Sequence, residues 1–267
     1  MSTKLTQFEN ATVGMCAGAI EVATLQPLNY FKNMIQQGLP IEYDVRKMYR
    51  GVGANVINMG SCTMIQFSVG GAAKKAIVGS ETRSLKAYEE MGAGVFAGVM
   101  SAFVGSPLEL IMIQQQRKGG STLKTIGTIA NPSTVGRGFI GTAVREGLWT
   151  CGYLAIPPII RKQLRESFPS SFDSDAKARI PASLLGGFFG CYMTHPFDTI
   201  KTCMQGDIEN KKFKGLIQTA RVVYGENGIT GFYRGALFRY ARMVIAVGML
   251  DTLGGAIGPV LYPHRFE

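Results

Sequence analysis

The fold of this chain is decided by the stretch His195-Pro196-Phe197-Asp198-Thr199-Ile200-Lys201, which follows an apolar run, residues 180–194, that carries no charge. A proline inside a helix removes one backbone hydrogen bond and clashes with the preceding turn, so Pro196 predicts a kink. Asp198 and Lys201 lie three residues apart and could pair within one helical turn, as such residues do in many soluble helices. Their position directly after a kinked apolar run indicates a more specialised arrangement.

The same pattern occurs three times in the chain. Each copy has a kink proline, then the position of the acid two residues later, the position of the base three residues after that, and a glutamine four residues further on. The copies comprise Pro27, Asn29, Lys32 and Gln36; Pro107, Glu109, Met112 and Gln116; and Pro196, Asp198, Lys201 and Gln205. They lie about 80–90 residues apart, which indicates tandem repeats of one structural unit.

These motifs resemble the signature of the mitochondrial carrier family, Pro-x-Asp/Glu-x-x-Lys/Arg, which occurs once in each of three tandem repeats. The third copy matches fully, whereas Asn29 replaces the acid of the first copy and Met112 replaces the base of the second. The resemblance implies an all-α membrane protein with a single carrier domain over 1–267. Its fold would be a six-transmembrane-helix bundle of three tandem two-helix repeats, with pseudo-threefold symmetry and short matrix-side amphipathic helices. The repeats would cover residues 8–80, 81–172 and 173–267.

Six apolar segments long enough to cross a bilayer are expected at residues 8–37, 54–77, 88–117, 139–164, 181–206 and 237–260. The first, third and fifth carry small residues four positions apart, which lets helices approach closely in lipid. These pairs are Gly14 with Gly18, Gly94 with Gly98, and Gly186 with Gly190. Residues 213–225 predict a short amphipathic helix along the membrane surface. The polar connections 80–84 and 165–175 share one side with both termini, and the resemblance implies that this side faces the intermembrane space.

Composition supports a membrane protein over a basic nucleic-acid binder. The 267 residues include 34 glycines, only 17% are charged, and the formal charge is +10. Glycine is commoner in membrane helices than in soluble ones. The bases lie mostly at the ends of apolar runs, so anionic lipid such as cardiolipin is the expected partner, and nucleic acid is not. The resemblance implies a multi-pass protein of the inner mitochondrial membrane, for which we expect a monomer.

The sequence offers little chemistry of the kind that enzymes use. The five cysteines show no CxxC spacing, which predicts free thiols and no metal site. We find no nucleophile–base pair and no phosphate loop, so we expect neither catalysis nor a cofactor. The first ten residues lack a secretory core and an arginine-rich presequence, and the resemblance implies internal targeting signals.

The resemblance places substrate contacts on the second helix of each repeat, seven residues after a shared Arg-Gly. Charged side chains inside membrane spans are functional candidates, and the guanidinium group of arginine suits carboxylates. The candidate substrate residues are Asn58, Cys62, Gln66, Arg145, Glu146, Arg239 and Arg242. Two alternatives stay open: Arg239 could instead pair with a helix C-terminus or a lipid headgroup, and Glu146 could offset an arginine or bind a substrate ammonium.

The substrate class follows from these residues and from the resemblance. Arg145-Glu146 is similar to amino-acid and carnitine carriers, whereas residues 234–242 are similar to tricarboxylate carriers. Because the arginines outnumber the acid, we predict exchange of a small carboxylate, such as a di- or tricarboxylate or a keto acid, by alternating access. An amino-acid or carnitine-like carrier is the first alternative. A carrier-derived scaffold that does not transport is the second, because two of the three motifs are degenerate.

The resemblance also predicts a matrix-side gate, in which the acid of one repeat pairs with the base of the next. The pairs would be Glu109 with Lys201, Asp198 with Lys32, and Asn29 with Met112, braced by Gln36, Gln116 and Gln205. The acids of the opposite gate are missing from the second helix of each repeat. Glu21 could face the cavity or pair with a neighbouring helix. His195, Trp149 and Tyr153 are expected to serve helix packing.

Overall fold

The computed structural model describes residues 6–79, 83, 85–154 and 156–266. Within these residues the chain forms helices and connecting segments, with no strand. The long helical segments are α1 (Gln7–Thr24) with α2 (Gln26–Gln36), α4 (Val52–Val78), α5 (Ala87–Lys118), α8 (Phe139–Leu154) with α9 (Ile156–Ser167), α10 (Asp175–Gly206) and α12 (Ala236–Leu261). They match the six predicted segments closely, which confirms their helical character.

The boundaries differ from the prediction in the first, fourth and fifth segments. The first divides at Leu25, whose N–H still bonds the Glu21 carbonyl at 2.9 Å, and Pro27 lies in the first turn of α2, where its missing N–H costs no helical bond. The fourth divides into α8 and α9 on either side of residue 155. α10 begins earlier, at residue 175, because the charged residues before the apolar run are compatible with a helix. Pro107 and Pro196 lie inside continuous helices.

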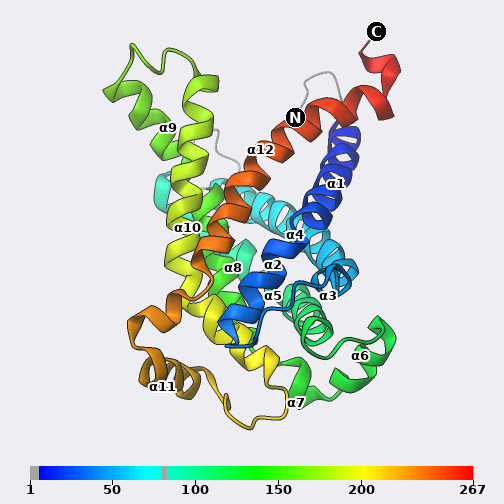
Figure 1. Cartoon of the computed structure of the whole chain (residues 1–267). Coiled ribbons are helices and arrows are strands. Elements are labelled where there is room, and N and C mark those ends of the chain that lie inside the picture. Colours follow the sequence, from blue (N-terminus) through cyan, green and yellow to red (C-terminus); the bar gives the residue numbers. More distant parts are fainter. Residues whose placement is uncertain (1–5, 80–82, 84, 155, 267) are drawn as a thin grey trace.

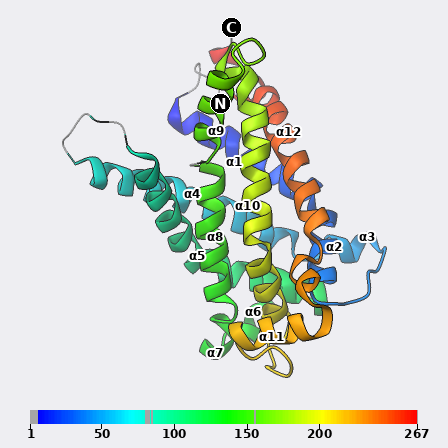
Figure 2. The ribbon, with the colours of Figure 1, turned by 90° about the vertical axis from the view of Figure 1, so that its left-hand side faces the viewer.

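Short helices collect at one end of the bundle. They are α3 (Val45–Met48), α6 (Thr122–Ile129), α7 (Pro132–Val135), α11 (Leu216–Asn227) and the 3-10 turn η1 (Ile229–Tyr233). The chain also has a second 3-10 turn, η2 (Pro263–Arg265). Figure 1 shows α6, α7 and α11 at the end opposite the labelled N and C ends, and Figure 2 shows the same separation from the side. The amphipathic helix predicted at residues 213–225 corresponds to α11. The η2 turn lies at the other end, after α12.

The long helices form a closed ring. Each packs against its neighbour in the chain, in the order α1, α4, α5, α8, α10 and α12, and α12 returns to pack on α1 and α2. Glycine allows the closest approaches: a β-carbon on Gly98 would overlap the Glu146 carbonyl, and one on Gly186 would lie 3.1 Å from the Gly152 oxygen. The small-residue spacing of the third and fifth segments therefore serves helix contact, as predicted.

Apolar and polar side chains are distributed differently from a soluble protein. Large hydrophobic residues are exposed along α4, α5, α10 and α12, among them Met64, Phe67, Phe96, Phe103, Phe189, Met193 and Leu237. The interior instead buries many polar and charged groups, among them Gln26, Asn33, Glu109, Asp198 and Lys201. Such an outer surface suits lipid surroundings. By length and hydropathy, α5 is the one helix of the described residues that could cross a membrane.

Candidate substrate site and gate

Three glycines join the repeats into a ring. Each begins or directly precedes the second helix of its repeat, and each has a positive φ, of +78°, +75° and +76° for Gly51, Gly138 and Gly235. A β-carbon at each would lie 3.0–3.3 Å from the base position of the next proline motif around the ring. These contacts join Gly51 with Met112, Gly138 with Lys201, and Gly235 with Lys32. The three motifs are thus held together by the same backbone contact.

The structure brings together the three pairs that the phasing of the repeats predicted. Lys32 Nζ lies 2.9 Å from Asp198 Oδ2, and Lys201 pairs with Glu109. The remaining pair is uncharged, with Asn29 Nδ2 3.2 Å from Met112 Sδ. All six side chains are on residues less than a tenth exposed. The ring therefore has two buried ion pairs and one neutral contact.

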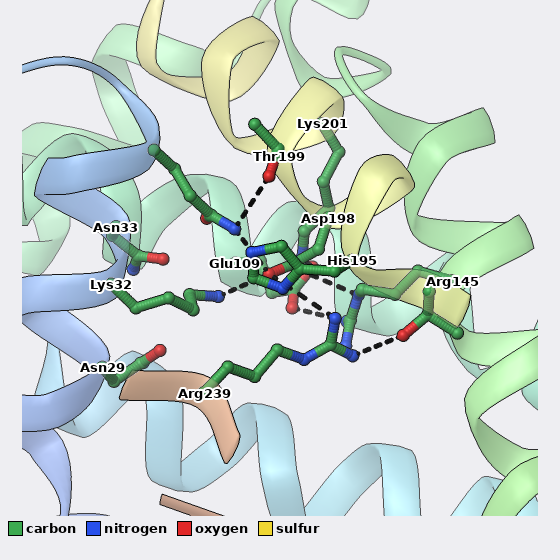
Figure 3. Close-up of polar contacts among 12 residues, drawn as sticks. Asn29, Lys32, Asn33, Glu109, Arg145, His195, Asp198, Thr199, Lys201 and Arg239 are labelled. Atoms are coloured by element: carbon green, nitrogen blue, oxygen red, sulfur yellow. Dashed lines mark hydrogen bonds and ion pairs between the residues drawn. The ribbon is translucent and has the colours of Figure 1, made fainter. Parts of the chain in front are cut away.

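Arg145 joins this ring rather than lying apart from it. Its Nη2 is 2.6 Å from Glu109 Oε1 and its Nε is 3.5 Å from Asp198 Oδ1, and it also pairs with Glu146. Figure 3 shows Lys32, Arg145 and Arg239 converging on the acids from different helices. The side chain of Arg145 is only 12% exposed. Arg145, predicted as a substrate contact, therefore also belongs to the ring of ion pairs.

Arg239 binds the helix that carries the third motif. It donates to Thr194 Oγ1 at 2.7 Å and to the Cys191 carbonyl at 3.3 Å, and it lies 3.9 Å from Asp198. Its guanidinium also stacks over the Trp149 ring, 5.5 Å from the centroid. The expectation that Trp149 only packs between helices is incomplete, because its π face holds a cation. The side chain of Tyr153 lies outside those that the structure describes.

The remaining predicted substrate residues lie on α4 and α12. Arg242 pairs with Glu21 of α1 at 3.0 Å, and its side chain is 32% exposed. The Cys62 thiol donates to Asn58 Oδ1 at 3.3 Å, and Gln66 Nε2 donates to Glu146 Oε2 at 3.0 Å. Asn58, Cys62 and Gln66 thus form one face of α4 toward α5 and α8. All five cysteines are free thiols, and only Cys16 is not buried.

Comparison with known proteins agrees with this arrangement. A family model described as "Mitochondrial carrier protein" matches residues 174–252. A probable mitochondrial 2-oxodicarboxylate carrier of Dictyostelium discoideum is 25% identical over 91% of this chain and 87% of its own length. Mitochondrial 2-oxodicarboxylate carrier 1 of Saccharomyces cerevisiae is 30% identical over 64% of this chain and 56% of its own length. A mitochondrial glycine transporter of S. cerevisiae is 29% identical over 71% of this chain and 67% of its own length.

The chain belongs to the mitochondrial carrier family. This membership makes it an all-α protein of a mitochondrial membrane, in a family of transporters rather than enzymes. Among the residues that the structure describes, no group of three or more His, Cys, Asp and Glu side chains could hold a metal ion.

The three glutamines of this carrier take different partners. Gln36 Nε2 donates to Asp198 Oδ2 at 3.0 Å and so braces an ion pair as predicted. Gln116 Oε1 instead accepts from Asn33 at 2.7 Å, and Gln205 Nε2 donates to the Ser106 carbonyl at 3.2 Å. Only the first glutamine therefore supports the prediction of a brace. The other two link neighbouring helices beside the ring.

Sequence reasoning missed several polar side chains of the carrier's ring. Asn33 binds Gln116, and Thr199 accepts from Gln36 at 3.3 Å. His195 Nε2 forms a hydrogen bond of 2.8 Å with the Arg234 carbonyl. It therefore links two segments of the third repeat as well as packing between helices. Asn33 could have been found from the polar stripe Asn29, Asn33 and Gln36 on one helix face. Thr199 carries no such signal.

A second polar cluster lies beyond α10, outside the helical bundle. Asp207 accepts from the backbone N–H groups of Lys211, Lys212 and Phe213 at 3.2, 2.7 and 2.8 Å. Arg137 donates to the Phe213 carbonyl at 2.5 Å and to that of Met204 at 3.0 Å. Burial alone would raise the pKa of Asp207, but these N–H donors and Arg137 outweigh it and hold the pKa below its usual range. Asp207 thus fixes the loop that follows the third motif.

Proposed function

We propose that this carrier exchanges a small carboxylate metabolite, such as a di- or tricarboxylate or a keto acid, across the inner mitochondrial membrane by alternating access. The observation that carries the proposal is the excess of cations around the ring. Lys32, Lys201, Arg145 and Arg239 surround three acids, Asp198, Glu109 and Glu146. One substrate carboxylate would balance this cluster, and 2-oxodicarboxylate, 2-oxoglutarate/malate and citrate carriers are among the relatives.

The architecture we propose has six transmembrane helices in three repeats. The ring order of the long helices and the equivalent contacts of Gly51, Gly138 and Gly235 support it. Both labelled chain ends lie away from α6, α7 and α11 (Figure 1). This separation supports termini in the intermembrane space and short helices on the matrix side. The basic side chains at the helix ends would contact anionic lipid headgroups, cardiolipin among them, around a monomer.

In this proposal the structure corresponds to a carrier closed toward the matrix. The ion pairs Lys32–Asp198 and Lys201–Glu109 would be the lock. A substrate carboxylate that binds Arg145 would compete with Glu109 and Asp198 for its guanidinium. Because Arg145 touches both acids of the lock, substrate binding would weaken the closed state and favour opening.

The alternative of an amino-acid substrate has an observation of its own. One relative is named as a glycine transporter, and Glu146 stands beside Arg145, where an ammonium and a carboxylate could bind together. Glu146 already accepts from Arg145 and from Gln66, however, so its charge is used within the protein. We therefore favour the carboxylate substrate.

Reconstitution into liposomes tests the proposal. Vesicles would be loaded with malate and supplied outside with labelled 2-oxoglutarate, citrate, malate or glycine. We expect rapid exchange of at least one carboxylate and little exchange of glycine. Lys162→Ala, whose side chain is 78% exposed on α9, is the matched control and should retain exchange. Exchange of glycine alone would select the amino-acid alternative. Folded protein that exchanges none of these would support a scaffold that does not transport.

A further inference from the structure

Glu21 is a buried acid that the proposed exchange does not use. It lies on α1 and is 1% exposed. One of its oxygens, Oε1, accepts from Arg242 Nη2 at 3.0 Å. The other oxygen, Oε2, accepts no hydrogen bond from the described residues. The Nε of Arg242 likewise finds no acceptor among them. The pair is therefore held by a single charged contact between two partly unsatisfied groups.

The surroundings of Glu21 hold no second cation that reaches it among the residues the structure describes. Helices α12, α4 and α2 pack against α1. Two arginines of α12 have partners: Arg242 binds Glu21, and Arg239 binds Thr194. Asp251 lies about 13 Å from Arg242 along the axis of α12, at 1.5 Å per residue. Lys32 of α2 belongs to Asp198, and the lysines of α4, Lys74 and Lys75, lie in its last two turns. The negative charge of Glu21 depends on Arg242.

Arg242 is also the more accessible member of the pair. Its side chain is 32% exposed, whereas that of Glu21 is 1% exposed. A substrate carboxylate could therefore reach the guanidinium group without reaching the acid behind it. Arginine can bind carboxylate through two parallel N–H donors, and Glu21 takes only one of them. An incoming carboxylate would therefore form a stronger contact than the one it replaces.

We propose that Glu21 couples transport of the carboxylate to the movement of one proton. This inference rests on the proposed function, exchange of a carboxylate substrate, and adds Arg242 as a group that binds a substrate carboxylate. When the substrate takes Arg242, Glu21 is left buried without a cation. It then accepts a proton from a hydronium ion on the side to which the carrier is open, and the hydronium O–H bond breaks to leave a water molecule. One O–H bond forms on the Glu21 carboxylate, and nothing is oxidised or reduced. When the substrate leaves, Glu21 gives the proton to water and returns to Arg242.

The physical reason is the cost of a lone buried charge. An ionised carboxylate in apolar surroundings is unfavourable unless it is paired, and protonation removes the cost. A structural ion pair would behave differently, because the substrate would not separate its members. The two cases differ in whether a proton enters the protein when the substrate binds.

Proton uptake on binding is the measurement that decides between them. Purified full-length protein in detergent would be titrated with 2-oxoglutarate at pH 7 by calorimetry in buffers of different ionisation enthalpy. We expect uptake of about one proton per 2-oxoglutarate bound by the wild type. Glu21→Gln should bind with no uptake, because the amide cannot take the proton. Glu9→Gln, at the other end of α1 and paired with Arg265, should behave as the wild type.

Exchange in liposomes at pH 6, 7 and 8 gives a second readout. Wild-type exchange of 2-oxoglutarate should fall severalfold as the pH rises, and exchange by Glu21→Gln should be nearly independent of pH. Glu21→Asp should restore the pH dependence and shows whether a carboxylate is what the position needs. Binding and exchange without proton uptake would overturn the coupling and leave the proposed function intact. Neither binding nor exchange of any carboxylate by folded wild type would overturn both.

Discussion

Asn29 Nδ2 lies 3.2 Å from Met112 Sδ, at the place in the ring where the other two repeats form ion pairs. The two departures from the family signature therefore fall on the two members of one contact. A charge left alone in a buried ring costs about 3–5 kcal/mol when its partner is removed. Losing both charges together avoids that cost and leaves a weaker lock.

Restoring the missing ion pair should strengthen the closed state. Asn29→Asp together with Met112→Lys would place opposite charges in contact, whereas either change alone would bury an unpaired charge. We expect each single variant to unfold at a lower temperature than the double variant, with a coupling energy of about 1–3 kcal/mol between the positions. Thermal unfolding in detergent measures stability, and liposome exchange measures the slower opening of the double variant.

The double-mutant cycle formed by Asn29→Asp and Met112→Lys also tests the alignment of the three repeats. Asn29→Asp combined with Lys162→Ala, at two positions that do not touch, should have additive effects and serves as the control. Absence of coupling between positions 29 and 112 would contradict their contact in the ring.

Arg145→Ala should destabilise the folded carrier as well as stop exchange. The sequence places Arg145 only among the candidate substrate contacts, but in the structure it contacts both Glu109 and Asp198. Its removal leaves these buried acids sharing the two lysines, and we expect a loss of about 3–5 kcal/mol, seen as a lower unfolding temperature. Arg145→Lys should recover part of the stability but little exchange, because an ammonium group lacks the planar guanidinium through which Arg145 reaches Glu109 and Asp198 from two different nitrogens. A wild-type unfolding temperature for Arg145→Ala would exclude this arginine from the ring.

Most of the ring could be predicted from the sequence because it depends on repeat phasing. Once the prolines are aligned, the partners of Lys32, Lys201 and Asn29 follow from cyclic order alone. The position of Arg145 could not be predicted, because a long flexible side chain two turns into a helix can reach several neighbours. Gln116 and Gln205 were misplaced for the same reason: their helix positions are equivalent to that of Gln36, but Asn33 and the Ser106 carbonyl offered closer partners.

Gly235→Ala should weaken the contact between the third and first repeats. Gly235 has φ +76°, and a β-carbon there would lie 3.1 Å from the Lys32 carbonyl oxygen. The left-handed backbone alone costs an L-residue about 1–2 kcal/mol, so we expect a loss of at least that size in thermal unfolding. Gly60→Ala is the matched control: nothing lies within 4 Å of its β-carbon position, and alanine there should stabilise the helix by up to about 1 kcal/mol. Equal effects of the two substitutions would argue against the contact.

Asp207→Asn should destabilise the carrier near neutral pH and matter less in acid. The pKa of Asp207 is lowered in the folded state, so its carboxylate adds stability above the unfolded value of about 4 and loses it as the pH falls through the folded value. The unfolding temperatures of wild type and variant should therefore differ between pH 5 and 7 and converge below. Asp173→Asn, at an exposed pair with Lys177, should change little at any pH. A difference that persists unchanged in acid would show that the charge of Asp207 is not what holds the loop.

Glu146→Gln tests whether this carrier binds a plain carboxylate or an amino acid. Glu146 accepts from Arg145 and from Gln66, and glutamine keeps its shape and an oxygen acceptor while removing the charge. If the charge serves only to hold Arg145, exchange of every transported substrate should change by the same factor, because each would meet the same loosened guanidinium. If the charge binds a substrate ammonium, glycine exchange should fall by about tenfold or more relative to 2-oxoglutarate, since a hydrogen bond to a charged group contributes about 1.5–3 kcal/mol. We expect the first result: Glu146→Gln should change the exchange rates of all transported substrates by the same factor, to within about twofold. Measuring both substrates in the same liposome preparation removes differences in the amount of folded protein, and a selective loss of glycine would move the assignment to an amino-acid carrier.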